Sequence, residues 1–257
     1  MAGLSARSVL VTGSNRGIGL ELVRQLLGHP NPPQWIFATC RDPEGASAQE
    51  LKNLASKHQS LVRVSLEVTN PASVKAAMAR VTEHLKGAGL NLLINNAGIV
   101  RVTTLDSETP EDMSFVYTTN VIGPMLVSQA FLPLLKKAAQ GSTQKGLSCN
   151  RAAIVNMSSS GGSITDVFAW DLGHVVSYRC SKAALNMLSR CQSLSYGADG
   201  ILCLALHPGW VQTDMGNFNE DLSRAEDSVR GILNVLAVLS EKDNGTFLDW
   251  EGKTLPW

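Results

Sequence analysis

The stretch Ser8-Val-Leu-Val-Thr-Gly-Ser-Asn-Arg-Gly-Ile-Gly19 decides the fold of this chain. Its apolar beginning, Ser8 to Thr12, predicts a buried strand. The residues from Gly17 to Leu27 then repeat apolar side chains at helical spacing. A glycine-rich turn therefore joins a strand to a helix, and α/β sheets use this arrangement to hold phosphate groups.

Each glycine of this turn suits a separate task. Gly13 can take the tight turn, Gly17 lets the backbone approach a pyrophosphate, and Gly19 lets the helix pack closely on the sheet. The spacing is GxxxGxG, which differs from the best-known dinucleotide fingerprint, GxGxxG. A glycine-rich turn without any ligand is the alternative interpretation. The predicted dinucleotide contacts in the turn are Gly13, Asn15, Arg16, Gly17, Ile18 and Gly19.

The alternation of strands and helices continues along the chain. Further strands are expected at 35–39, 61–66, 91–95, 153–157, 201–206 and, as a short edge strand, 246–248. Further helices are expected at 44–57, 72–86, 110–137, 177–196 and 223–239. This order predicts an α/β fold: a single Rossmann-type, doubly wound parallel β-sheet flanked by helices on both faces. Residues 140–150 are interpreted as a surface loop, so residues 1–257 are predicted to form one domain.

Composition excludes several classes of partner. The 257 residues carry 22 Lys and Arg against 22 Asp and Glu, so net charge indicates neither a nucleic acid nor an anionic membrane as partner. The five cysteines are scattered, and His and Cys do not cluster at ligand spacing, so we expect reduced thiols and no metal site. No signal-peptide pattern and no unbroken apolar run of membrane-spanning length is present, so a cytoplasmic protein is expected.

Polar motifs follow three of the predicted strands. Asn96-Ala97-Gly98 comes after strand 91–95, three serines at 158–160 come after strand 153–157, and Pro208-Gly209 comes after strand 201–206. Because the carboxyl ends of parallel strands meet at one edge of a sheet, these motifs are expected beside the glycine turn.

Tyr178 and Lys182 lie four residues apart on a predicted helix, so their side chains share one face. Reduction of a carbonyl needs a hydride from a cofactor and a proton from an acid. A free phenol has a pKa of about 10, and the nearby ammonium is expected to lower the pKa of Tyr178. A tyrosine that packs beside a solvated lysine is the alternative, but the serine-rich strand end before the helix favours a catalytic pair.

These motifs, in this order, resemble those of the short-chain dehydrogenase/reductase family over nearly the whole chain from Ser8. The segments 178–186, 207–216 and 250–257 are similar to the carbonyl reductase branch called sniffer or C-factor-like. The resemblance implies that Tyr178 is the acid/base, that Lys182 also binds the nicotinamide ribose, and that Ser159 orients the substrate carbonyl. Ser158 and Ser160 remain alternative registers. The same resemblance implies that Asn120 perturbs its helix and holds a water linked to Lys182.

The resemblance also implies further cofactor contacts. Asn96, Ala97 and Gly98 would line the adenosine, and Glu67 with Val68 stands where many relatives place Asp-Val against adenine. A further group would cover the nicotinamide: Pro208, Gly209, Val211 and Thr213. The following residues, 214–222, are expected to form a lid.

The choice between the two nicotinamide cofactors depends on Arg41 and Arg16. Strand 35–39 is not followed by a carboxylate that would hold a ribose 2′-hydroxyl, and Arg41 stands there instead. Guanidinium groups bind phosphate oxygens in a bidentate manner, so NADP(H) is predicted. Ordinary solvated arginines, with Asp42 paired to Arg41, are the alternative.

The predicted function is NADPH-dependent reduction of a ketone, aldehyde or quinone, with Tyr178 as proton donor. The interval between Ser159 and Tyr178 is longer than in many relatives, and residues 161–176 are expected to arch over an apolar substrate. A non-catalytic NADP(H)-binding sensor or scaffold and an NAD-dependent alcohol dehydrogenase remain alternatives. A homodimer through helices 110–137 and 177–196 is also left open.

Overall fold

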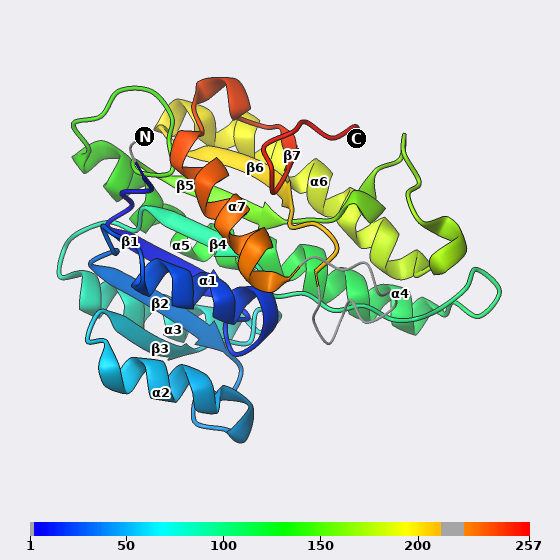
Figure 1. The fold of residues 1–257 in the computed structure, drawn as a ribbon, viewed down its shortest axis with the longest axis horizontal. Coiled ribbons are helices and arrows are strands. Elements are labelled where there is room, and N and C mark those ends of the chain that lie inside the picture. The colour runs from blue at the N-terminus through cyan, green and yellow to red at the C-terminus, as the bar shows by residue number, and fades with distance from the viewer. Residues whose placement is uncertain (1–2, 212–223) are drawn as a thin grey trace.

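A computed structural model describes residues 3–211 and 224–257. These residues form one sheet of seven strands, in the order β3-β2-β1-β4-β5-β6-β7 (Figure 1). Every neighbouring pair of strands is parallel. The chain therefore starts in the middle of the sheet and winds outward in both directions, as the sequence predicts. The strands are β1 Ser8–Thr12, β2 Trp35–Cys40, β3 Leu61–Ser65, β4 Leu92–Asn95, β5 Ala153–Met157, β6 Leu202–His207 and β7 Phe247–Asp249.

Helices cover both faces of the sheet. On one face α1, α2 and α7 pack against the strands, and on the other face lie α3, α5 and α6 (Figure 1). Short 3₁₀ turns occupy several of the connections. The helices are α1 Gly17–Leu27, α2 Gln49–Lys57, α3 Pro71–Leu85, α4 Pro110–Tyr117, α5 Gly123–Gly141, α6 Val176–Tyr196 and α7 Ala225–Val238.

Burial follows from this double covering. All five residues of β1 are buried, and their side chains alternate between two apolar cores. Val9 and Val11 belong to the core beneath α1, α2 and α7, whereas Leu10 belongs to the core beneath α3 and α5. A strand buried on both faces carries an unbroken apolar run, which is why the strands could be located in the sequence.

The predicted helix 110–137 is longer than expected and is not uniform. A single π-helical turn, Thr118–Ile122, separates α4 from α5, and α5 continues to Gly141. By length and a mean hydropathy of 1.2, the stretch Pro110–Gly141 would be sufficient to cross a membrane. No unbroken apolar run of this length is present, as the sequence indicates, because polar residues such as Asn120 and Gln129 interrupt the stretch. Half of the apolar window is buried inside the protein, and α5 packs on β4 and β5 as a core helix does.

The other predicted bounds agree with the structure to within a few residues. The largest difference is the helix predicted at 44–57, where a 3₁₀ turn at Ala46–Ala48 precedes α2. The predicted start of the last helix at Ser223, the lid at 214–222 and the contact residue Thr213 lie outside the described residues.

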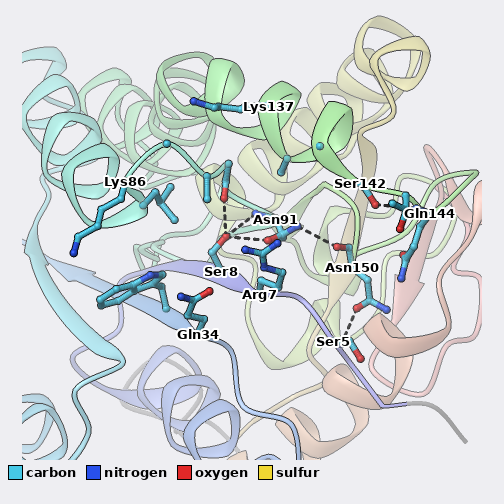
Figure 2. A pocket seen from close by; sticks show the side chains of 18 residues that line it. Ser5, Arg7, Ser8, Gln34, Lys86, Asn91, Lys137, Ser142, Gln144 and Asn150 are labelled. Atoms are coloured by element: carbon cyan, nitrogen blue, oxygen red, sulfur yellow. Dashed lines mark hydrogen bonds between the residues drawn. The ribbon is translucent and has the colours of Figure 1, made fainter.

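A hollow of about 620 Å³ opens at the amino ends of the strands (Figure 2). Its floor is closed by polar side chains that bond to one another. The Ser8 hydroxyl donates to Asn91 Oδ1 at 3.0 Å, and Asn91 Nδ2 donates to the carbonyls of Asn150 and Arg151 at 3.1 and 2.9 Å. These contacts fix the start of β1 to the residues before β4 and β5, at the edge of the sheet opposite the predicted site.

Candidate active site

The turn between β1 and α1 has the backbone that its glycines allow. Gly13 has a φ of +65° and Gly17 has a φ of +54°, in the left-handed region that other residues avoid. A Cβ on Gly19 would lie 2.2 Å from the carbonyl oxygen of Gly13, so only glycine fits there. Arg16 precedes the helix without capping it through its side chain. The first N–H groups of α1 therefore lack a side-chain cap from that residue and suit a phosphate.

The end of β4 is fastened to this turn by a residue that the sequence analysis did not single out. The Thr12 hydroxyl accepts hydrogen bonds from the backbone N–H groups of Asn96 and Ala97, both at 2.9 Å. Asn96 Nδ2 in turn donates to the carbonyls of Thr12 and Gly13 at 2.9 and 3.2 Å. The predicted contacts Asn96 and Ala97 are thus held directly beside the glycine turn. Thr12 lies inside the quoted motif, and its position before Gly13 was the available signal.

Arg41 extends into solvent at the end of β2, and 83% of its side chain is exposed. Its Nε lies 3.9 Å from Glu67 Oε2, so the ion pair of Arg41 is with Glu67 and not with Asp42, as the alternative interpretation had it. Glu67 Oε1 also accepts from the Thr69 hydroxyl at 3.1 Å. In the turn, Asn15 Nδ2 donates to the Ser47 carbonyl at 3.5 Å. An exposed guanidinium with one distant partner can turn toward a phosphate at little cost.

Lys182, Asn120 and Gly98 meet at the carboxyl edge of the sheet. Lys182 is buried, and its Nζ donates to the carbonyl of Met157, the last residue of β5, at 2.7 Å. A Cβ on Gly98 would lie 3.3 Å from Asn120 Oδ1 and 3.7 Å from Lys182 Nζ. The predicted residues of the β4 end, the long helix and α6 therefore converge on one point.

Asn120 sits in the π-helical turn and is buried. Its Nδ2 donates to the Ile99 carbonyl and to the Ser181 hydroxyl, both at 2.9 Å, and its Oδ1 accepts from Ile99 N–H at 2.9 Å. Its side-chain amide is thus fully engaged with neighbouring segments. The helix departs from α geometry at this residue, in the π turn, and the role expected for Asn120 in causing the departure stays a prediction.

The three candidate serines differ in their partners. The buried Ser158 hydroxyl donates to Asn186 Oδ1 at 2.5 Å, so it fixes β5 to α6. Ser159 accepts a hydrogen bond from Gly161 N–H at 3.1 Å, and its side chain lies close enough to the Tyr178 phenol to lower the pKa of that group. Of the two, Ser159 is the serine that the structure brings to the phenol. Ser160 begins a short 3₁₀ turn, Ser160–Gly162.

Tyr178 is in the first turn of α6, where burial raises the pKa of its phenol. The hydrogen bond with Ser159 and the charge of Arg179 act in the opposite direction. The expectation that Lys182 lowers this pKa was wrong. The Lys182 ammonium lies 5.4 Å from the centroid of the Tyr178 ring, donates to Met157 instead, and has its own pKa lowered to about 8 by burial. Burial of the Tyr178 phenol therefore decides the direction of its pKa shift, and the charge of Lys182 does not.

Pro208 and Gly209 follow β6, and Gly209 has a φ of +83°. A Cβ on Gly209 would lie 2.9 Å from Trp250 Nε1, so the indole packs directly beneath this turn. Val211 is buried just beyond it. The residues predicted to cover the nicotinamide therefore form a turn at the carboxyl edge of the sheet, and Trp250 packs against this turn.

The sequence profile of the family described as short chain dehydrogenase matches residues 7–223. The chain therefore belongs to the short chain dehydrogenase family, and it is an oxidoreductase. Among curated relatives, C-signal of Myxococcus xanthus is 38% identical over 169 residues, which are 65% of this chain and 93% of that protein. An uncharacterised oxidoreductase of Schizosaccharomyces pombe is 30% identical over 264 residues and 96% of each chain.

Two solved structures are similar over nearly the whole length. The structure of an NADPH-bound carbonyl reductase from chicken fatty liver has a TM-score of 0.96 and 64% sequence identity, covering 99% of this chain and 100% of that one. Carbonyl reductase Sniffer of D. melanogaster has a TM-score of 0.92 and 38% identity, covering 98% of this chain and 100% of that one. These similarities confirm both the doubly wound fold and the resemblance to the carbonyl reductase branch.

Proposed function

We propose that residues 1–257 form a single-domain, NADPH-dependent carbonyl reductase that acts on a ketone, aldehyde or quinone. The observation that carries this proposal is the contact between Ser159 and Tyr178, with Lys182 on the same helix and Asn120 beside it. A sensor or scaffold that has lost catalysis has no need to keep this group of side chains together.

The turn between β1 and α1 has the features that binding of NADPH requires. Gly13 and Gly19 leave no room for side chains, and α1 begins without a side-chain cap, which leaves N–H groups for the pyrophosphate. Arg41 and Arg16 would bind the 2′-phosphate, and Lys182 would bind the nicotinamide ribose. The remaining cofactor contacts would be Asn15, Gly17, Ile18, Glu67, Val68, Asn96, Ala97, Gly98, Tyr178, Pro208, Gly209, Val211 and Thr213.

When bound, NADPH supplies the hydride. The protein supplies the proton and the orientation of the substrate. The Tyr178 hydroxyl donates its proton to the carbonyl oxygen as negative charge develops there, and the Ser159 hydroxyl donates a hydrogen bond to the same oxygen. Lys182, on the same helix as Tyr178, would hold the nicotinamide ribose beside the phenol. Asn120 fixes the position of α6 through Ser181.

The substrate is proposed to be a small apolar carbonyl compound. Residues 161–176 expose Ile164, Val167, Phe168 and Trp170, and the Phe168 ring meets the Trp210 ring edge-on at 6.2 Å, beside the Pro208-Gly209 turn. This contact supports a place for the segment near the substrate.

Exposed apolar side chains on α4 and α6 support pairing of two copies of the chain. Phe115 and Tyr117 lie exposed on α4, and Met187 and Leu194 on α6. Such a patch suits a homodimer through these helices. Light scattering of the purified protein tests this.

A cytoplasmic location stays a prediction.

The test is an NADPH-oxidation assay over a panel of ketones, aldehydes and quinones, run with wild type and Tyr178→Phe. Turnover by wild type and its loss in the variant are expected. An inactive wild type that still binds NADPH tightly would favour the sensor or scaffold. Faster alcohol oxidation with NAD would favour the alcohol dehydrogenase.

A further inference from the structure

The segment 161–176 is held in a strained backbone. Ala169 has φ 56° and ψ 34°, and Val175 has φ 39° and ψ 52°. This left-handed conformation is avoided by residues other than glycine, and by β-branched residues such as valine above all. Val175 directly precedes α6, whose third residue is Tyr178. Such a conformation persists only where the surroundings impose it.

The guanidinium of Arg179 bonds the carbonyl directly before each of these two residues. Its Nη2 donates to the carbonyls of Phe168 and Gly173 at 3.0 and 3.2 Å, and its Nε donates to the carbonyl of His174 at 2.8 Å. One side chain from α6 thus joins both left-handed positions of the segment. A planar guanidinium can do this because its donors point in fixed, divergent directions.

The three hydrogen bonds from Arg179 to the segment 161–176 are called the clamp below, and ring contacts add to it. The Arg179 guanidinium carbon lies 5.5 Å from the centroid of the Trp170 ring, and Trp170 stacks on His174 with centroids 4.3 Å apart and planes 10° apart. Through Phe168, whose carbonyl Arg179 holds, the segment also meets Trp210. Arg179 therefore contacts the part of the segment that carries its aromatic side chains, Phe168, Trp170 and His174.

The charge of Arg179 is not neutralised by this clamp. Its hydrogen bonds go to neutral carbonyls, and its buried Nη1 has no hydrogen-bond partner within residues 3–211 and 224–257. Arg179 Nη1 and Ser159 Oγ lie 3.7 and 3.3 Å from the point where a Gly161 Cβ would be, so the cation is near the Ser159 end of the site. Among the residues that the structure describes, the guanidinium thus has no carboxylate partner, and its positive charge lies close to Ser159 and Tyr178.

Other charged or titratable groups surround Tyr178. Lys182 lies on α6, Glu108 accepts from the N–H of the residue before Tyr178, His174 lies in the segment, and His207 ends β6. The charge of Arg179 lowers the pKa of the phenol against the effect of burial.

We propose that Arg179 is a positioning residue with two separable roles. Its three bonded N–H groups hold the segment 161–176 over the site and so select the carbonyl substrate, and its charge stabilises the phenolate form of Tyr178. The inference rests on the proposed function, but each role also predicts a property of the protein without substrate.

The test compares Arg179→Met, which removes charge and bonds, with Arg179→Lys, which keeps the charge but cannot reach three carbonyls. Arg190→Met is the matched control, because Arg190 lies on the same helix and donates to the Gly245 carbonyl. Two measurements need no turnover: ultraviolet titration of tyrosinate, with Tyr178→Phe subtracted, and hydrogen exchange of residues 161–176. The third is the split between KM and kcat for bulky and small carbonyls.

Arg179→Met is expected to move the Tyr178 titration to higher pH, to accelerate exchange in 161–176, and to raise KM for bulky substrates about tenfold. In Arg179→Lys the Tyr178 titration is expected to return to the wild-type pH. The exchange rate of 161–176 and the KM for bulky substrates are expected to stay as high as in Arg179→Met. The charge role is overturned if Arg179→Met titrates as wild type, and the clamp role if exchange in 161–176 matches the Arg190→Met control. If wild type reduces no carbonyl, the proposed function fails, while the titration and exchange still decide the roles of Arg179.

Discussion

Ser158, directly after β5, donates its hydroxyl hydrogen to Asn186 Oδ1 on α6 at 2.5 Å, and this contact is buried. The adjacent Ser159 instead accepts from Gly161 N–H, and its side chain interacts with the Tyr178 phenol and lowers the pKa of that group. Two neighbouring serines thus have different tasks: one fastens the strand to the helix, and the other serves the candidate site.

The pair of serines predicts two different phenotypes. Ser159→Ala should lower kcat/KM about 100-fold, because a hydrogen-bond donor to the developing oxyanion is lost, with little change in the free energy of unfolding. Ser158→Ala should cost about 1–3 kcal/mol of folding stability, because Asn186 loses a buried partner, with kcat near wild type. Steady-state kinetics and urea unfolding measure both. If Ser158→Ala lowered kcat/KM and Ser159→Ala lowered folding stability, the catalytic role would belong to Ser158.

Tyr178→Phe should reduce turnover by about 10²–10⁴-fold, since the ring remains but the proton donor is removed. NADPH binding, measured by fluorescence titration, should change little. Tyr196→Phe, at the other end of α6, is the control and should keep its activity. A Tyr178→Phe enzyme that turns over at the wild-type rate would remove this residue from the mechanism.

Arg41→Asp should raise KM for NADPH at least about tenfold while KM for NADH stays the same or falls, because the guanidinium proposed to bind the 2′-phosphate becomes a carboxylate. Kinetics with both cofactors measure this ratio. Arg80→Asp, which breaks an exposed pair with Glu83, serves as the control for a charge change elsewhere. An equal loss with both cofactors would contradict recognition of the phosphate by Arg41.

Stability should fall in mildly acidic solution because of His207. Burial lowers the pKa of this imidazole from 6.5 to about 4. Between these two pH values the unfolded chain binds more protons than the folded one, so this contribution is lost as pH falls from about 6.5 toward 4. His207→Gln should remove up to about 3 kcal/mol of this pH dependence. Urea unfolding across the window checks it, and parallel pH profiles of variant and wild type would contradict it.

Gly19→Ala should destabilise the fold by about 3 kcal/mol, because the new Cβ would lie 2.2 Å from the carbonyl oxygen of Gly13. Gly28→Ala is the matched control at the end of the same helix. There a Cβ would lie 3.5 Å from the nearest atom, an ordinary contact, and the change should be within about 1 kcal/mol. Thermal unfolding of both variants measures the difference, and equal stabilities would show that the turn can open at Gly19.

Much of the fold could be read from the sequence because strands buried on both faces carry unbroken apolar runs, as Leu202 to Leu206 does. The site could be located because polar residues such as Ser159 follow such runs, and the ends of parallel strands lie together.

The rest depends on distances that a sequence does not contain. The raised pKa of Tyr178 follows from how deeply α6 is buried, which spacing to Lys182 does not reveal. Likewise, the bonds of Arg179 go to backbone carbonyls, such as that of Phe168, whose directions are fixed only by the path of the loop. Every residue has a backbone carbonyl, so hydrogen bonds to carbonyls cannot be recognised from the types of residue in the sequence.

Trp250 beneath Gly209 has a consequence for how this protein is made on the ribosome. The glycine turn belongs to the first strand to emerge, whereas the indole that supports the turn after β6 emerges some forty positions after that turn. A nascent chain therefore carries an unfinished crevice for most of its synthesis. Nucleotide binding should begin only after Trp250 has left the ribosome, so ligand-assisted folding cannot act on intermediates that lack this indole.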